Sequence, residues 1–229
     1  MTMAAIQSRL PGRFTLLLIL LPTALLIAPL LGDFSAGRVL FNITLMLLLL
    51  SSVHATGLKR RERLIAWGVI SVSVGVRLTG HVVDHAGVRI IGDLLTALSL
   101  WLVTGVLFLY VVRAVHVDMN VLSAALCVYL LLGLTFALLY AALEVVAPGS
   151  FAMPDDPASA VPSRFVGRTP DYVYYSLITM TTTGFGDIRP VSQIARSLTV
   201  IEVLAGQIYL AVMIARLVSL WRVGLSSEK

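Results

Sequence analysis

Residues 181–187 of the chain read Thr-Thr-Thr-Gly-Phe-Gly-Asp. Ordinary extended backbone points successive carbonyl groups to opposite sides, whereas glycine takes positive φ at little steric cost. Gly184 and Gly186 therefore allow the residues beside them to turn their carbonyl oxygens the same way. The first charged side chain is Asp187, at the end of the stretch. The stretch predicts a row of backbone oxygens along one axis, which is how a filter replaces the hydration shell of a cation.

The chain around this stretch is strongly apolar. Of its 229 residues, 58% are hydrophobic and 13% are charged, whereas soluble domains carry about 25% charged residues. The mean hydropathy is +0.94. In a soluble protein the stretch could be a glycine-rich surface turn, but this composition predicts an integral membrane protein. Apolar stretches long enough to cross a membrane, which takes roughly 17–25 helical residues, occur at 14–31, 39–55, 64–83, 88–112, 119–146 and 198–220.

Residues 170–181 are expected to form a short re-entrant pore helix. They are too few and too polar to span the bilayer, and such a segment is tolerated at membrane depth when it is buried in protein. Pro170 suits the first helical turn, and the acidic Asp171 favours the positive end of the helix dipole. The partially negative end of the helix would then point toward the ion path.

Residues 182–187 resemble the filter signature of the potassium channel superfamily, Thr-Val-Gly-Tyr-Gly-Asp. Thr183 stands where valine is usual, and Phe185 stands where tyrosine is usual. The resemblance, to bacterial six-span channels, implies K+ as the permeant ligand, and no cofactor is expected. Since the filter departs from the usual signature, a weakly selective monovalent cation channel is the alternative. The expected ion-binding filter consists of Thr182, Thr183, Gly184, Phe185 and Gly186, with K+ on the oxygens of the first four.

Several side chains are expected to support the filter from outside the ion path. Tyr174 and Tyr175 stand where the family carries an aromatic cuff around the filter, although tyrosines at this depth also suit the membrane interface. Glu202 is an acid inside an apolar span, which is costly unless it is paired, and a hydrogen bond to the pore helix is the favoured role. The full set of expected supporting residues is Thr181, Asp187, Tyr174, Tyr175 and Glu202.

The last span is expected to be the inner, pore-lining helix, over residues 193–222. Gly206 stands where the gating hinge of bacterial potassium channels lies. A helical glycine costs up to about 1 kcal/mol relative to alanine, and close packing against the pore helix would explain it as well as bending. Arg216, near the end of the helix, is expected to extend to the inner headgroups.

Two domains are expected. Residues 1–113 would form a four-helix bundle that resembles a voltage sensor, and residues 114–229 would form the pore domain. One chain supplies one filter strand, whereas a cage of carbonyl groups needs a closed ring, so the resemblance implies a homotetramer. The expected fold class is thus an all-α membrane protein with six spans, a pore helix and a filter. The parts of the pore domain are the outer helix 119–146, the turret 147–169, the pore helix 170–181, the filter 182–186 and the inner helix 193–222.

The fourth span is expected to give little voltage dependence. Voltage sensors carry repeated Arg or Lys on this helix, whereas residues 94–112 contain no charged residue. At the outer end of the third span, His81, Asp84 and His85 share one helical face and have metal-ligand chemistry. A wetted helix end is the expected role of these three residues, with proton or metal sensing as the alternative.

The basic cluster at residues 59–63 indicates membrane orientation. By the positive-inside rule it marks a cytoplasmic loop between the second and third spans. The protein is therefore expected in the cell membrane, with both termini in the cytoplasm and the Asp187 end of the filter outside. The chain lacks a paired catalytic motif, so no enzyme is expected, and nucleic acid is not an expected partner. Expected partners are membrane lipids, three further copies of the chain, and a regulatory subunit or ligand that sets gating.

Overall fold

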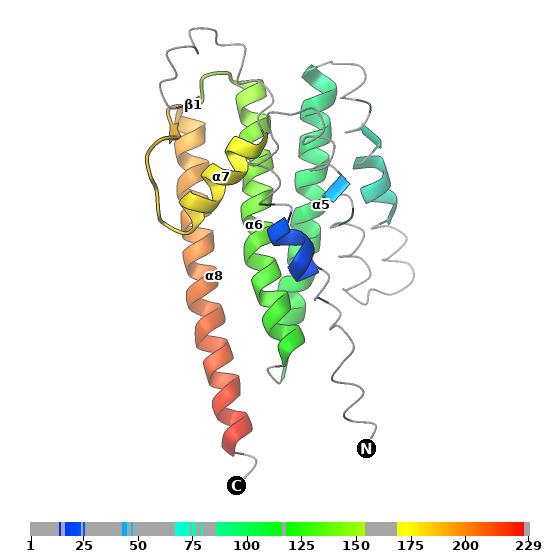
Figure 1. The fold of residues 1–229 in the computed structure, drawn as a ribbon, viewed down its shortest axis with the longest axis vertical. Coiled ribbons are helices and arrows are strands. Elements are labelled where there is room, and N and C mark those ends of the chain that lie inside the picture. The colour runs from blue at the N-terminus through cyan, green and yellow to red at the C-terminus, as the bar shows by residue number, and fades with distance from the viewer. Residues whose placement is uncertain are drawn as a thin grey trace.

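The computed structural model describes residues 14, 17–23, 25, 43–44, 47, 67–73, 75–76, 79, 86–115, 118–153 and 169–226. Within these ranges, long helices run side by side and a short helix lies obliquely across one end of them (Figure 1). The described elements are α5 (Ala86–Arg113), α6 (Met119–Val146), β1 (Phe151–Ala152), α7 (Thr169–Met180), β2 (Arg189–Pro190) and α8 (Gln193–Ser226).

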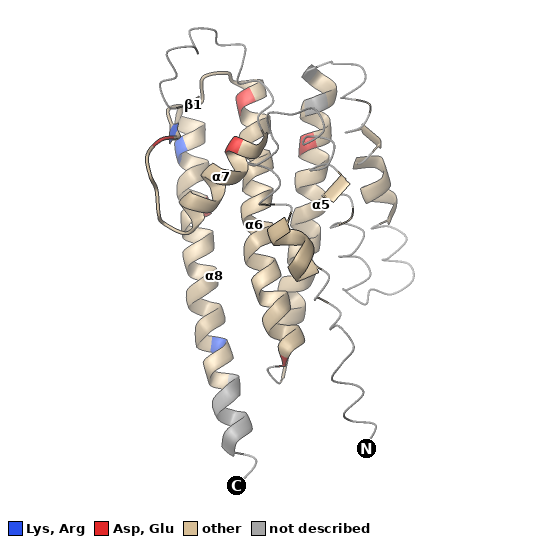
Figure 2. Cartoon of the chain, viewed as in Figure 1, with Lys and Arg blue, Asp and Glu red and all other residues tan. Residues whose placement is uncertain are grey.

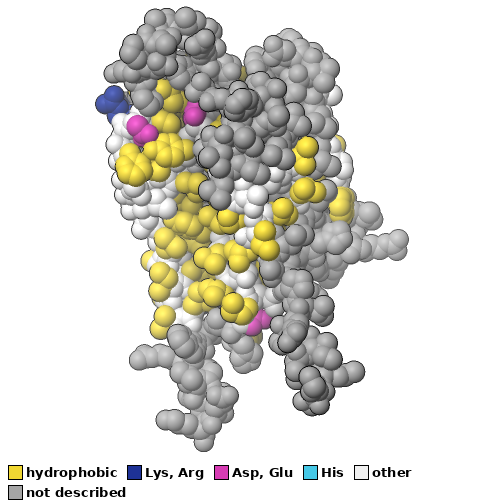
Figure 3. Space-filling model, viewed as in Figure 1, with side chains coloured by type: hydrophobic (Ala, Val, Ile, Leu, Met, Phe, Trp, Pro, Cys, Tyr) yellow, Lys and Arg dark blue, Asp and Glu magenta, His cyan; other side chains and the backbone are white. Residues whose placement is uncertain are grey.

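Three helices of the described part are long and apolar enough to cross a membrane, over Ile90–Arg113, Met119–Val146 and Gln193–Ser219. Most described charged side chains lie toward the ends of these helices (Figure 2). Apolar side chains are spread over the visible face between those ends (Figure 3). The chain is therefore an all-α membrane protein, as predicted. The expected spans 14–31, 39–55 and 64–83 lie largely outside the described residues, so the number of six spans stays a prediction.

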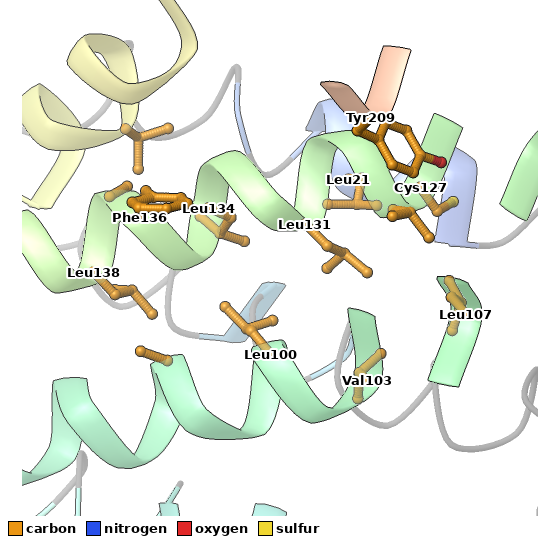
Figure 4. Packing of buried hydrophobic residues seen from close by; sticks show 14 of the residues in the cluster. Leu21, Leu100, Val103, Leu107, Cys127, Leu131, Leu134, Phe136, Leu138 and Tyr209 are labelled. Carbon is orange, nitrogen blue, oxygen red and sulfur yellow. The ribbon is translucent and has the colours of Figure 1, made fainter. Parts of the chain in front are cut away.

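Helix α6 is the centre of the described fold, with α5 on one side and α7 and α8 on the other. Its first turn is capped by Asp118, whose carboxylate accepts a hydrogen bond from the Val121 N–H at 2.8 Å, as N-cap residues commonly do. Leu100 and Leu107 of α5 pack toward Leu131 of α6, and all three are fully buried (Figure 4). Since lipid is as apolar as leucine, close van der Waals packing rather than hydrophobicity holds these helices together.

A two-residue antiparallel ladder ties the segment after α6 to the segment after the filter. Phe151 pairs with Pro190 and Ala152 pairs with Arg189. The Ser150 carbonyl also accepts the Val191 N–H at 2.8 Å. This ladder is the one described departure from an all-helical fold, and it arises because the loops on both sides of α7 return to the same place. The ladder fixes where α8 begins relative to α6.

Candidate functional site

The glycine-rich loop follows directly from α7, which packs against both α6 and α8. Helix α7 spans Thr169–Met180, one residue earlier at each end than the expected pore helix. It has twelve residues, too few to cross a membrane, and most of its side chains are buried. The loop therefore follows directly from the buried Met180, and its residues 181–186 are exposed in the single chain.

The backbone of the loop alternates in handedness. Thr182, Gly184 and Gly186 have φ values of 59°, 52° and 79°, whereas Thr183 and Phe185 between them have no positive φ. The two glycines thus take the conformation expected of them, and Thr182 adds a third left-handed position. Positive φ at every second residue departs from ordinary extended backbone, in which successive carbonyl groups point to opposite sides.

Two hydrogen bonds show which way these peptide groups point. The N–H groups of Thr183 and Gly184 both donate to the Ile178 carbonyl of α7, at 2.8 and 3.1 Å. No described peptide bond is cis, and in a trans peptide the carbonyl points opposite to the N–H that follows it. The carbonyl oxygens of Thr182 and Thr183 therefore both point away from α7.

The threonine hydroxyls of the loop bond to one another and to the backbone. The Thr181 and Thr183 hydroxyls lie 3.0 Å apart, so the polar group that replaces the usual valine has a partner. The Thr182 hydroxyl donates to the Thr181 carbonyl at 2.7 Å. A donating hydroxyl keeps its oxygen lone pairs, so Thr182 can still offer an oxygen ligand at the inner end of the row.

Tyr174 of α7 holds the Asp187 end of the loop. Its hydroxyl donates to the Asp187 carboxylate at 2.8 Å, and the other carboxylate oxygen accepts the Ile188 N–H at 3.0 Å. The hydrogen bond to Asp187 raises the pKa of the Tyr174 hydroxyl, so the phenol stays a donor. Asp187 thus links the loop exit to α7.

Tyr175, beside Tyr174, has different partners. Its hydroxyl lies 2.9 Å from the Thr199 hydroxyl of α8. Its ring packs edge-on against Tyr140 and Phe151, with ring centroids 5.2 and 5.4 Å away. Of the two expected cuff residues, Tyr174 contacts Asp187 at the end of the glycine-rich loop, whereas Tyr175 joins α7 to α6 and α8.

Glu202 is completely buried behind α7. One carboxyl oxygen lies 2.5 Å from the Tyr140 hydroxyl of α6, and the other contacts the Ser176 hydroxyl of α7. The Ser176 hydroxyl also lies 2.6 Å from the Gly133 carbonyl of α6. A single carboxyl group therefore joins α6, α7 and α8.

Gly206 lies against the end of α7. A Cβ at this position would stand 2.5 Å from Met180 Cγ and 3.4 Å from the Met180 carbonyl oxygen. That carbonyl accepts hydrogen bonds from Tyr129 of α6 and Gln207 of α8, each at 3.2 Å. Close packing explains the glycine, and α8 continues unbroken through it. Its role as a gating hinge stays a prediction.

Sequence reasoning missed several residues of the site: Tyr129, Gly133, Tyr140, Ser176, Ile178 as an acceptor, and Gln207. The sequence could have indicated Gln207, because it is a polar residue within an apolar span and follows Gly206. The tyrosines of α6 gave no such indication, since tyrosine is common in such helices. Other expected residues lie outside the described part of the chain: His81, Asp84, His85, the basic cluster 59–63 and most of the turret. In the described ranges no three His, Cys, Asp or Glu residues could hold a metal together.

The site geometry agrees with what comparison with known proteins reveals. No curated protein and no solved structure matches the chain. A family described as ion channel matches residues 96–222, which is more than half of the chain and includes most of α5, all of α6 and α7, the loop and most of α8. The chain therefore belongs to an ion channel family, and it is a membrane transport protein rather than an enzyme.

Proposed function

We propose that the chain forms a potassium-selective channel whose filter is residues 182–186. The observation that carries this proposal is the pair of hydrogen bonds from Thr183 and Gly184 to the Ile178 carbonyl. It turns two successive carbonyl oxygens to the same side, and such oxygens coordinate a dehydrated cation. The row lies at the partially negative end of α7, which favours a cation further.

The permeant ions would pass along a four-fold axis formed by four copies of the chain. Residues 181–186 are exposed in the single chain, and polar backbone does not face lipid at membrane depth. Helix α8 also exposes apolar side chains at every fourth position, at Val200, Leu204, Ile208 and Val212. A ring of copies would place the filter around water and line the path below it with this face of α8.

The channel is expected to open with little dependence on voltage. Residues 94–112 of α5 carry no charge that could move in the membrane field, and each such charge would contribute about 2.3 kcal/mol per 100 mV. We also propose that the Asp187 end of the filter faces outward and that both termini lie in the cytoplasm. These two proposals rest on the residue pattern and on the positive-inside rule.

Potassium flux into lipid vesicles tests the proposal. Gly184→Ala should abolish flux, because Gly184 has a φ of 52° and a side chain there is strained by roughly 1–2 kcal/mol in each of four copies. Gly105→Ala is the matched control, since nothing lies within 4 Å of the added Cβ, and it should leave flux intact. Native mass spectrometry should give a tetramer for both variants. Equal flux through the two variants would contradict the proposal.

A further inference from the structure

The contacts around Glu202 allow its proton to be located by counting donors. The Ser176 hydroxyl has one proton, yet it lies against two acceptors, the Gly133 carbonyl at 2.6 Å and a Glu202 oxygen. If Glu202 were ionised, one of these contacts would join two lone pairs. If Glu202 carries a proton, it donates to Ser176, Ser176 donates to Gly133, and Tyr140 donates to the other carboxyl oxygen. Each contact then has one proton.

The surroundings of Glu202 also favour its protonated form. The side chain is 0% exposed, and an ionised carboxylate in such a place is costly unless a charged partner or hydrogen-bond donors to both oxygens offset the burial. The titratable groups that face it are Tyr129 and Tyr140 of α6 and Tyr175 of α7, all of which are neutral at physiological pH. Helix α8, which carries Glu202, contributes the Thr199 hydroxyl to this cluster.

A second buried acid of the chain shows the opposite pattern. Glu144, which is 7% exposed, accepts the Gly149 N–H at 2.6 Å with one oxygen and the Phe151 N–H at 3.2 Å with the other. Both partners are donors, so the ionised form satisfies Glu144 without a proton. The two acids therefore differ in what a glutamine substitution would do to their hydrogen bonds.

We propose that Glu202 is a neutral carboxylic acid that positions the filter, and that its ionisation at raised pH releases a proton to solvent and lowers conduction. Ser176 lies two residues before Ile178, whose carbonyl fixes the N–H groups of Thr183 and Gly184. The ionised carboxylate keeps the single Ser176 proton, because it is a stronger acceptor than a carbonyl group. The contact of Ser176 with the Gly133 carbonyl of α6 is then lost, which frees this part of α7 to move. Glu202 thus acts on the ion path through α7, and this part of the inference rests on the proposed channel function.

Infrared spectroscopy of the protein in lipid vesicles tests the proton directly. At neutral pH, the wild-type protein should show the carbonyl band of a protonated carboxylic acid, which Glu202→Gln should remove and Glu144→Gln should retain. The infrared band does not depend on conduction, so its result tests the proton assignment independently of the proposed channel function. A band that is absent from the wild type, or that persists in Glu202→Gln, would overturn the proton assignment.

Potassium flux measured against pH tests the positioning role. In Glu202→Gln the amide can donate to Ser176 and accept from Tyr140, so the variant should conduct at all pH values. Wild-type flux should fall roughly tenfold as the pH rises. The loss of the hydrogen bond from Ser176 to Gly133 changes the ratio of channels with α7 in place to channels with α7 displaced by about that factor. Glu144→Gln should lose flux at every pH, because the NH2 group of its amide would face a backbone N–H, and two donors cannot form a hydrogen bond with each other. Identical pH profiles for the wild type and Glu202→Gln would overturn the positioning role.

Discussion

At the scale of single residues, Gly206 is where α8 packs against the end of α7. The absence of a side chain lets α8 pass against Met180, and the Met180 carbonyl receives hydrogen bonds from Tyr129 and Gln207. The atom that a new Cβ would strike is Met180 Cγ, near the base of that side chain. Relief of this clash would require α7 itself to move, and the filter begins at the end of α7.

Gly206→Ala is therefore expected to lower the free energy of unfolding by about 1–3 kcal/mol, the usual cost of overpacking a close contact. Thermal unfolding in detergent or lipid measures this change. Gly105→Ala adds the same methyl group where nothing lies within 4 Å. That control should be neutral, or more stable by up to about 1 kcal/mol because alanine favours helix. The packing explanation fails if both variants melt at the wild-type temperature.

The conformation of the filter could be predicted at its glycines and not at Thr182. Gly184 and Gly186 were expected to take positive φ because glycine does so at little cost. Thr182 takes a φ of 59°, which a β-branched residue disfavours by roughly 1–2 kcal/mol. The reason lies in α7, since the Ile178 carbonyl draws the next two N–H groups to one side. Such a constraint comes from tertiary structure, so the residue type at position 182 does not predict it.

At the scale of elements, Arg216 joins the inner helix to the end of α5. Its guanidinium donates to the Val112 carbonyl and, at 2.9 Å, to the Ala114 carbonyl. The last carbonyl groups of a helix lack partners within it, and a positive charge there is favourable. The expectation that Arg216 extends to the lipid headgroups was therefore incomplete. The side chain caps α5 and couples it to the lower part of α8.

Arg216→Ala should destabilise the protein by about 1.5–3 kcal/mol, the range for hydrogen bonds that involve a charged group. Arg196→Ala is the comparison on the same helix, because Arg196 is exposed and makes one long contact, at 3.4 Å, to the Pro190 carbonyl. Thermal unfolding of the two variants side by side should show a drop for Arg216→Ala alone. A similar drop for both would mean that the cap on α5 contributes no specific stability.

The helices could be predicted more fully than the contacts between them. The outer helix was expected at 119–146, and α6 covers the same residues, because a long apolar run and a capping aspartate mark its extent. The contacts of Glu202 with Tyr140 and of Arg216 with Ala114 join residues 62 and 102 positions apart. Hydrophobic pattern places these residues in helices, but it does not say which side chains meet.

At the scale of the whole molecule, α5 lies along α6 of the same chain without a charged face that could sense voltage. Its described middle part, residues 94–112, is free of charged residues, and the basic residue of its last turn is Arg113. The expected bundle of residues 1–113, which resembles a voltage sensor, would then stabilise the pore domain without opening it in response to voltage. Coupling between the two parts would pass through the short connection after α5 and through Arg216.

The open probability of the channel should accordingly change little between about −100 and +100 mV, since gating without moving charges gains no energy from the field. Single-channel recording in planar bilayers at symmetric potassium measures this directly. The number of open events should stay nearly constant while the current through each open channel follows the voltage. A steep rise in open probability with voltage would show that charges outside the described residues move during gating.

The reversal potential of the purified protein in a planar bilayer, with potassium on one side and sodium on the other, tests the potassium filter most directly. The proposed filter over residues 182–186 predicts a potential that follows the potassium gradient, and Gly105→Ala should give the same value. A potential near zero would contradict the claim, because it would mean that the filter passes sodium as readily as potassium.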